Sequence, residues 1–81
     1  MTLSNTVNQA IVMDQKIREI SAIAASVAAH CQPCLKFHYG KAKELGIPQE
    51  DIVQIIELAL KISDKGDEYM SKFADEVLLE K

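Results

Sequence analysis

Apolar and polar positions recur with a helical period along nearly the whole chain. In the first third, apolar residues repeat about every 3.6 positions between Val7 and Ala28, and no Gly or Pro interrupts them. Polar residues 4–6 offer an N-cap. The pattern predicts one continuous helix over about residues 6–29. Its second half, residues 21–29, is small and apolar, and is expected to be buried.

Proline and glycine mark the next boundaries. Pro33 disfavours α geometry in the residue before it, so the first helix is expected to end near residues 30–32. Pro33 also suits a helix start, and we predict a second helix over residues 33–45 that folds back beside the first. Gly46 is a natural residue to follow that helix, and Pro48 with acidic residues behind it indicates that another helix begins.

A third helix is predicted over residues 48–63, with apolar side chains around most of its circumference. These side chains are Ile52, Val53, Ile55, Ile56, Leu58, Ala59, Leu60 and Ile62. A helix that is apolar nearly all round is buried on several sides, which predicts contacts with other subunits. Gly66 is expected to break the chain before a fourth helix over residues 67–80. No strand pattern is present, so we expect one all-α domain over residues 1–81, with about four helices and an antiparallel hairpin.

Composition and charge narrow the possible partners. Hydrophobic residues make up 48% of the chain, and the net charge is −3 with nine scattered Lys and Arg. No basic stripe is available for phosphates, so nucleic acid is not expected as a partner. The first residues lack the order of a signal peptide, and no run reaches the roughly 18 apolar residues of a membrane span. We therefore expect a cytoplasmic protein with no membrane partner.

The candidate chemistry lies at the turn of the predicted hairpin. Cys31 and Cys34 are the two cysteines of the chain, and their spacing allows a small disulfide loop. Cys34 falls in the first turn of the predicted second helix, and His38 follows four residues later on the same face. An imidazole and a helix N-terminus together lower a cysteine pKa and favour the thiolate. The pattern indicates a redox dithiol, with His38 as the base.

An inert pair, a zinc site and a haem attachment site are weaker interpretations of the two cysteines. Two inert cysteines could share this spacing by chance. A zinc site would need His30, Cys31, Cys34 and His38 together, but His30 and Cys31 are adjacent and cannot easily point at one ion. A c-type haem would need His directly after the second cysteine, where Leu35 stands. We therefore expect neither a metal nor another cofactor.

The stretch from about residue 17 to residue 60 resembles the carboxymuconolactone decarboxylase-like domain, in particular its alkylhydroperoxidase AhpD-like branch. That branch carries the pattern Glu-x11-Cys-x2-Cys-x3-His, which Glu19, Cys31, Cys34 and His38 match in register. The similarity continues through Ala42, Gly46-Ile47 and Asp51-Ile52. The chain departs from the family pattern at Pro33, where an aromatic residue is common, and in its short length.

The resemblance implies a thiol peroxidase or disulfide reductase. In such proteins the residue matching Cys34 attacks a peroxide, the residue matching Cys31 resolves the sulfenic acid, and a dithiol partner restores both thiols. His38 and Glu19 would form a proton relay. The resemblance also implies a homotrimer or homohexamer. A thiol-disulfide carrier without peroxidase activity and a non-catalytic interaction module remain alternatives.

The position of Glu19 raises a geometric question. A continuous first helix puts Glu19 about 18 Å from Cys31, and a turn at Pro33 leaves it roughly 10 Å along the axis from His38. That distance is beyond hydrogen-bond reach. Either the relay needs bridging water and a tilted helix pair, or Glu19 reaches His38 from a neighbouring subunit. We favour the neighbouring subunit.

Overall fold

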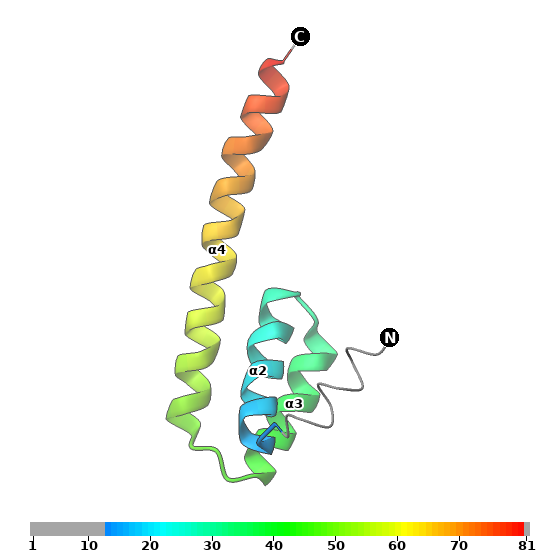
Figure 1. Ribbon diagram of the computed structural model, residues 1–81, viewed down its shortest axis with the longest axis vertical. Coiled ribbons are helices and arrows are strands. Elements are labelled where there is room, and N and C mark those ends of the chain that lie inside the picture. The colour runs from blue at the N-terminus through cyan, green and yellow to red at the C-terminus, as the bar shows by residue number, and fades with distance from the viewer. Residues whose placement is uncertain (1–12, 81) are drawn as a thin grey trace.

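A computed structural model describes residues 13–80 of the chain, and this range is all-helical (Figure 1). Helix α2 spans Gln15–Ala28, α3 spans Gln32–Glu44 and α4 spans Gln49–Leu79. Figure 1 shows α2 and α3 as an antiparallel hairpin, with α4 running along α2 and continuing far past the hairpin. The expected all-α class and the hairpin with the cysteine pair at its turn are confirmed.

Helix α2 begins later than the periodicity predicts. Asp14 is its N-cap, with extended backbone angles, and its Oδ1 accepts hydrogen bonds from the backbone N–H groups of Lys16 at 2.7 Å and Ile17 at 3.3 Å. A single helix from residue 6 to residue 29 is therefore wrong, because the chain is not helical at Asp14. The predicted N-cap at residues 4–6 lies outside the described residues.

Helix α3 and the start of α4 follow the sequence signals closely. α3 begins one residue before Pro33 and ends one residue before the predicted end, with Lys41 and Lys43 in its last turn. Gly46 follows in the left-handed region, with φ of 77°. Pro48 is the N-cap residue of α4, and two acidic residues lie in the first turn of that helix.

Gly66 does not break the chain. The third and fourth predicted helices are one helix, α4, of 31 residues. A Gly in a helix interior costs only about 1 kcal/mol relative to Ala, and no Pro adds a second stop signal. Among residues 13–80 the chain therefore has three helices rather than the expected four.

The core lies where α2, α3 and the first half of α4 meet. Its buried side chains are Ile23, Ala42, Ile47 and Ile52, and Ala59 is buried further along α4. Burial of residues 21–29 is only partly confirmed, since several of their alanines are exposed. The apolar residues of α4 likewise remain exposed on several sides in the single chain, so the predicted subunit contact stays a prediction. None of the helices in residues 13–80 has the length and apolarity that a membrane crossing requires.

Candidate active site

The turn between α2 and α3 ends one helix and positions the start of the next. The His30 N–H donates to the carbonyl of Val27 at 3.1 Å. The Cys31 N–H donates to the carbonyl of Ser26 at 2.9 Å. These are the two hydrogen bonds of a Schellman motif, with His30 in its left-handed position at φ of 58°. The motif makes Cys31 the N-cap residue of α3.

The two predicted redox residues are bonded to each other. Cys31 and Cys34 form a disulfide, and their Cα atoms are 5.2 Å apart. Cys34 lies in the first turn of α3 and is exposed, whereas Cys31 is partly buried. Pro33 between them occupies a first-turn position, where its missing N–H removes no intrahelical hydrogen bond. An external reactant can therefore reach Cys34 more easily than Cys31.

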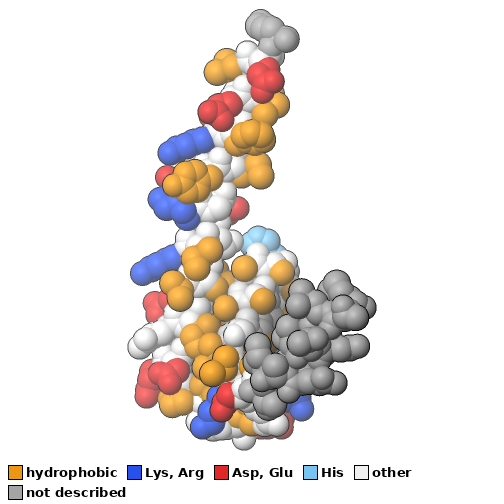
Figure 2. Space-filling view, viewed as in Figure 1, with side chains coloured by type: hydrophobic (Ala, Val, Ile, Leu, Met, Phe, Trp, Pro, Cys, Tyr) orange, Lys and Arg blue, Asp and Glu red, His pale blue; other side chains and the backbone are white. Residues whose placement is uncertain are grey.

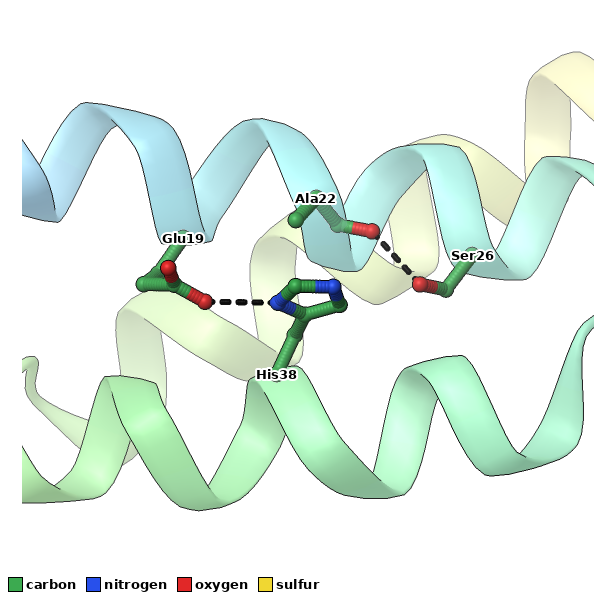
Figure 3. Close-up of polar contacts among 4 residues, drawn as sticks. All are labelled: Glu19, Ala22, Ser26 and His38. Carbon is green, nitrogen blue, oxygen red and sulfur yellow. Dashed lines mark hydrogen bonds and ion pairs between the residues drawn. The ribbon is translucent and has the colours of Figure 1, made fainter. Parts of the chain in front are cut away.

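Glu19 and His38 form the one contact between an acidic and a basic side chain in residues 13–80 that joins two helices. Glu19 Oε1 on α2 is 2.7 Å from His38 Nδ1 on α3 (Figure 3). The Glu19 side chain is 13% exposed and the His38 side chain is 29% exposed. The contact is thus shielded from water more than an ordinary surface pair, which strengthens it.

This contact corrects the expectation that Glu19 reaches His38 from a neighbouring subunit. Both residues belong to the same chain. The estimate of roughly 10 Å took Pro33 as the turning point. Because α2 ends at residue 28 and α3 begins at residue 32, the turn is centred on residue 30. His38 then lies level with Ala22, about 4.5 Å along the axis from Glu19, and the two long side chains close that gap.

The hydrogen bond also orients the imidazole. An ionised Glu19 can only accept, so Nδ1 of His38 carries the proton and donates it to Oε1. In the neutral imidazole, Nε2 is then the nitrogen without a proton, and it can accept one. Figure 3 shows the second ring nitrogen on the side of His38 away from Glu19, facing along the hairpin in the direction of the turn. The disulfide lies at that turn, one helical turn before His38 on α3.

A groove of about 420 Å³ lies beside the Glu19–His38 pair. The Phe37 ring meets the His38 ring edge-on, with centroids 5.1 Å apart. Lys41 Nζ lies over the Phe37 ring, 5.7 Å from its centroid. Arg18 and Glu44 also line this groove, so its wall is largely charged.

A second groove, of about 360 Å³, lies beside the partly buried cysteine. Cys31 shares it with His30 and with apolar side chains of all three helices. These side chains are Val27, Leu35, Ile56 and Leu60. The sulfur of Cys31 therefore has an apolar approach, whereas the Glu19–His38 pair has a polar one.

Sequence reasoning missed two residues of this region. The Phe37 ring packs edge-on against the His38 ring, although Phe37 is 59% exposed. It was missed because an aromatic residue on a helix is more often a core residue. Ser26 is buried, its hydroxyl donates to the Ala22 carbonyl at 2.6 Å, and its own carbonyl accepts from the Cys31 N–H. The signal that could have found Ser26 is its position five residues before Cys31, because a Schellman motif joins residues at that separation by a backbone hydrogen bond.

Among the comparisons with known proteins, one family model matches the chain. The model described as the carboxymuconolactone decarboxylase family matches residues 3–65 of the chain. The match includes Glu19, both cysteines and His38. Neither a curated protein nor a solved structure gave a significant match.

Proposed function

The chain belongs to the carboxymuconolactone decarboxylase family, and we propose that it is a thiol-dependent peroxidase that uses Cys31 and Cys34. One observation supports this most directly. The closed disulfide lies one helical turn along α3 from an imidazole that a carboxylate holds in place. A dithiol, a base and a group that orients the base form the set that activated cysteines require.

The proposed reaction begins with the reduced dithiol. The Cys34 thiolate attacks one oxygen of a hydroperoxide, the O–O bond breaks, and the products are a Cys34 sulfenic acid and an alcohol or water. The Cys31 thiol then attacks the sulfenic sulfur and releases water as the disulfide forms. Two electrons pass from the dithiol to the peroxide, so the cycle leaves the enzyme oxidised.

In the proposed reaction His38 transfers the protons, and Glu19 assists it. His38 Nε2 takes the proton of the Cys34 thiol, and the imidazolium that results is stabilised by Glu19 at Nδ1. The same imidazolium then protonates the alkoxide that leaves as the O–O bond breaks. General acid–base assistance of this kind accelerates a reaction by about 10²- to 10⁴-fold.

A second dithiol must return the enzyme to its reduced form. Its thiolate attacks the disulfide, forms a mixed disulfide and leaves as a closed disulfide after a second exchange. Cys34 is the exposed sulfur and is the one we assign to this mixed disulfide. Such recycling requires a reducing compartment, and the cytoplasm supplies one.

Single cysteine substitutions test the assignment. We expect Cys34→Ser to abolish peroxide reduction. We expect Cys31→Ser to consume one equivalent of peroxide and leave a sulfenic acid at Cys34, which dimedone traps and mass spectrometry locates. The matched control is Ser71→Cys in a chain that lacks both native cysteines, because Ser71 is an exposed position on a helix far from the pair. Cys34 should react at least about 100-fold faster than this control thiol.

Two outcomes would contradict the proposal. A trapped sulfenic acid at Cys31 in the Cys34→Ser variant would reverse the roles of the two cysteines. Peroxide reactivity equal to that of the Ser71→Cys thiol would exclude a peroxidase. If the native pair still exchanged rapidly with a small dithiol, the protein would be a thiol-disulfide carrier, and if it did not, an interaction module.

A further inference from the structure

The second half of α4 projects beyond the hairpin with no covering element among residues 13–80 (Figure 1). Every residue from Asp64 to Glu80 is exposed. Large apolar side chains nonetheless lie on this segment. Tyr69 is 65% exposed, Met70 is 64% exposed and Phe73 is 58% exposed. In Figure 2 hydrophobic side chains lie on both sides of the projecting segment, with a row of them on the right, and the lysines lie on the left.

The spacing of Met70 and Phe73 continues the face of α4 that packs on α2. Spacings of four and three residues alternate along the helix without a break. The positions are Ile52, Ile56, Ala59, Ser63, Gly66, Met70, Phe73 and Val77. The first half of this stripe is buried or partly buried, and the second half has no counterpart in the described chain. A sustained heptad spacing is the pattern by which one helix packs along another.

Charged residues lie on the opposite face, which also carries the exposed Leu79. Glu68 forms ion pairs with Lys65 at 3.3 Å and with Lys72 at 3.9 Å. These three charged side chains therefore lie together at the solvent-exposed surface of the helix. Residues 64–80 contain six acidic and two basic residues, a net charge of −4. An amphipathic helix that lies on an anionic membrane carries the opposite charge. The apolar stripe therefore fits a helix of a protein better than a lipid surface.

We propose that residues 60–80 of α4 pair with the same residues of a second copy, antiparallel and centred near Met70. Charge selects this direction. Asp75, Glu76 and Glu80 make the end of the helix acidic, and parallel pairing would bring two acidic ends together. Antiparallel pairing instead sets each acidic end near Lys61 and Lys65 of the other copy.

The exposed area suits such a pair. An aromatic side chain presents about 150–250 Å² in full, so exposures of 65% for Tyr69 and 58% for Phe73 leave roughly 90–160 Å² on each. Leu60, Ile62, Met70 and Val77 are also 46–64% exposed. Together these side chains supply apolar contact toward the ~800 Å² per partner of a stable interface.

The pairing also reaches the cysteine region. An antiparallel register centred on Met70 places Glu80 of one copy level with Leu60 of the other. Leu60 lines the apolar groove beside Cys31. The end of each α4 would then lie at the mouth of that groove in the second copy.

One substitution and a matched control test the pairing. Phe73→Asp puts a charge in the stripe, whereas Ser71→Asp puts the same charge on the opposite face. In light scattering at micromolar concentration, we expect Phe73→Asp to halve the mass of the wild-type assembly and Ser71→Asp to leave it unchanged. Met70→Asp serves as a second stripe variant, and circular dichroism checks that all variants stay helical.

Spin labels test the direction. Glu80→Cys, in a chain with Cys31→Ser and Cys34→Ser, carries one label on each copy. Antiparallel pairing separates the two labels by about 30 Å along the axis, whereas parallel pairing places them about 10 Å apart. A short distance would overturn the antiparallel arrangement. A monomeric wild type, or equal dissociation by Phe73→Asp and Ser71→Asp, would overturn the pairing itself.

Discussion

At the residue scale, His30 and Gly46 hold the same position in two copies of one helix-ending motif. Each follows a helix end in the left-handed region, with φ of 58° for His30 and 77° for Gly46. Each motif has the same pair of backbone hydrogen bonds. Gly adopts this conformation without steric cost, whereas a residue with a Cβ atom pays about 1–2 kcal/mol. His30 therefore introduces strain directly before Cys31.

Replacement of His30 should expose this strain. We expect His30→Gly to raise the free energy of unfolding by up to about 1 kcal/mol, since relief of the strain exceeds the entropy that Gly loses on folding. Urea unfolding of the oxidised protein measures the change. His30→Val is the opposite control and should lower stability by at least about 1 kcal/mol, because a β-branched residue is a poor fit to this region. A destabilising Gly would show that the imidazole makes stabilising contacts of its own, and a stabilising Val would contradict the backbone strain at this position.

At the scale of elements, α4 is one helix because nothing opposes its continuation strongly enough. Gly66 lies in its interior, and a Cβ atom built there would meet no other atom within 4 Å. We expect Gly66→Ala to stabilise the protein by about 1 kcal/mol through helix propensity alone. Thermal unfolding followed by circular dichroism measures this. An unchanged or lower melting temperature would indicate that a close neighbour in the assembly needs the space that Gly leaves.

The sequence predicts elements best where signals for their ends lie close together. Pro33, Gly46 and Pro48 each fix the backbone locally, and the ends of α3 and the start of α4 came out within one residue. Gly66 was misleading because a single weak signal competed with a long run of helix-forming residues. The start of α2 was missed because apolar periodicity continues through Asp14, whose capping role depends on two backbone hydrogen bonds.

In the candidate site, too, the features that depend on local spacing were predicted and the feature that depends on two helices was not. The cysteine pair and the place of Cys34 in the first turn of α3 follow from local spacing, and the disulfide agrees with them. The Glu19–His38 contact joins two helices, so it depends on where the turn is centred. A shift of the turning point by a few residues moves the predicted partner by several ångströms. Spacing along one helix is therefore a safer guide than distance across a hairpin.

At the scale of the whole molecule, thirteen large hydrophobic residues among residues 13–80 are exposed, whereas five hydrophobic residues are buried. Ten of the thirteen lie on α4. The trimer or hexamer implied by the family resemblance stays a prediction, and antiparallel pairing of α4 would supply the two-fold contact that a hexamer built from trimers needs. Assembly would then be required for stability and not for completing the Glu19–His38 pair.

Mixed assemblies test this separation of roles. We expect Glu19→Gln and His38→Ala each to lower the peroxide reaction rate by about 10²-fold or more, because each disables the same relay. When the two variants are unfolded, mixed and refolded together, activity should not recover, since no chain then contains both groups and the contact forms within one chain. Wild-type chains diluted with either variant serve as the control, and their activity should fall in proportion to the wild-type fraction. Recovery in the mixture of the two variants would mean that Glu19 acts across subunits in the assembled protein.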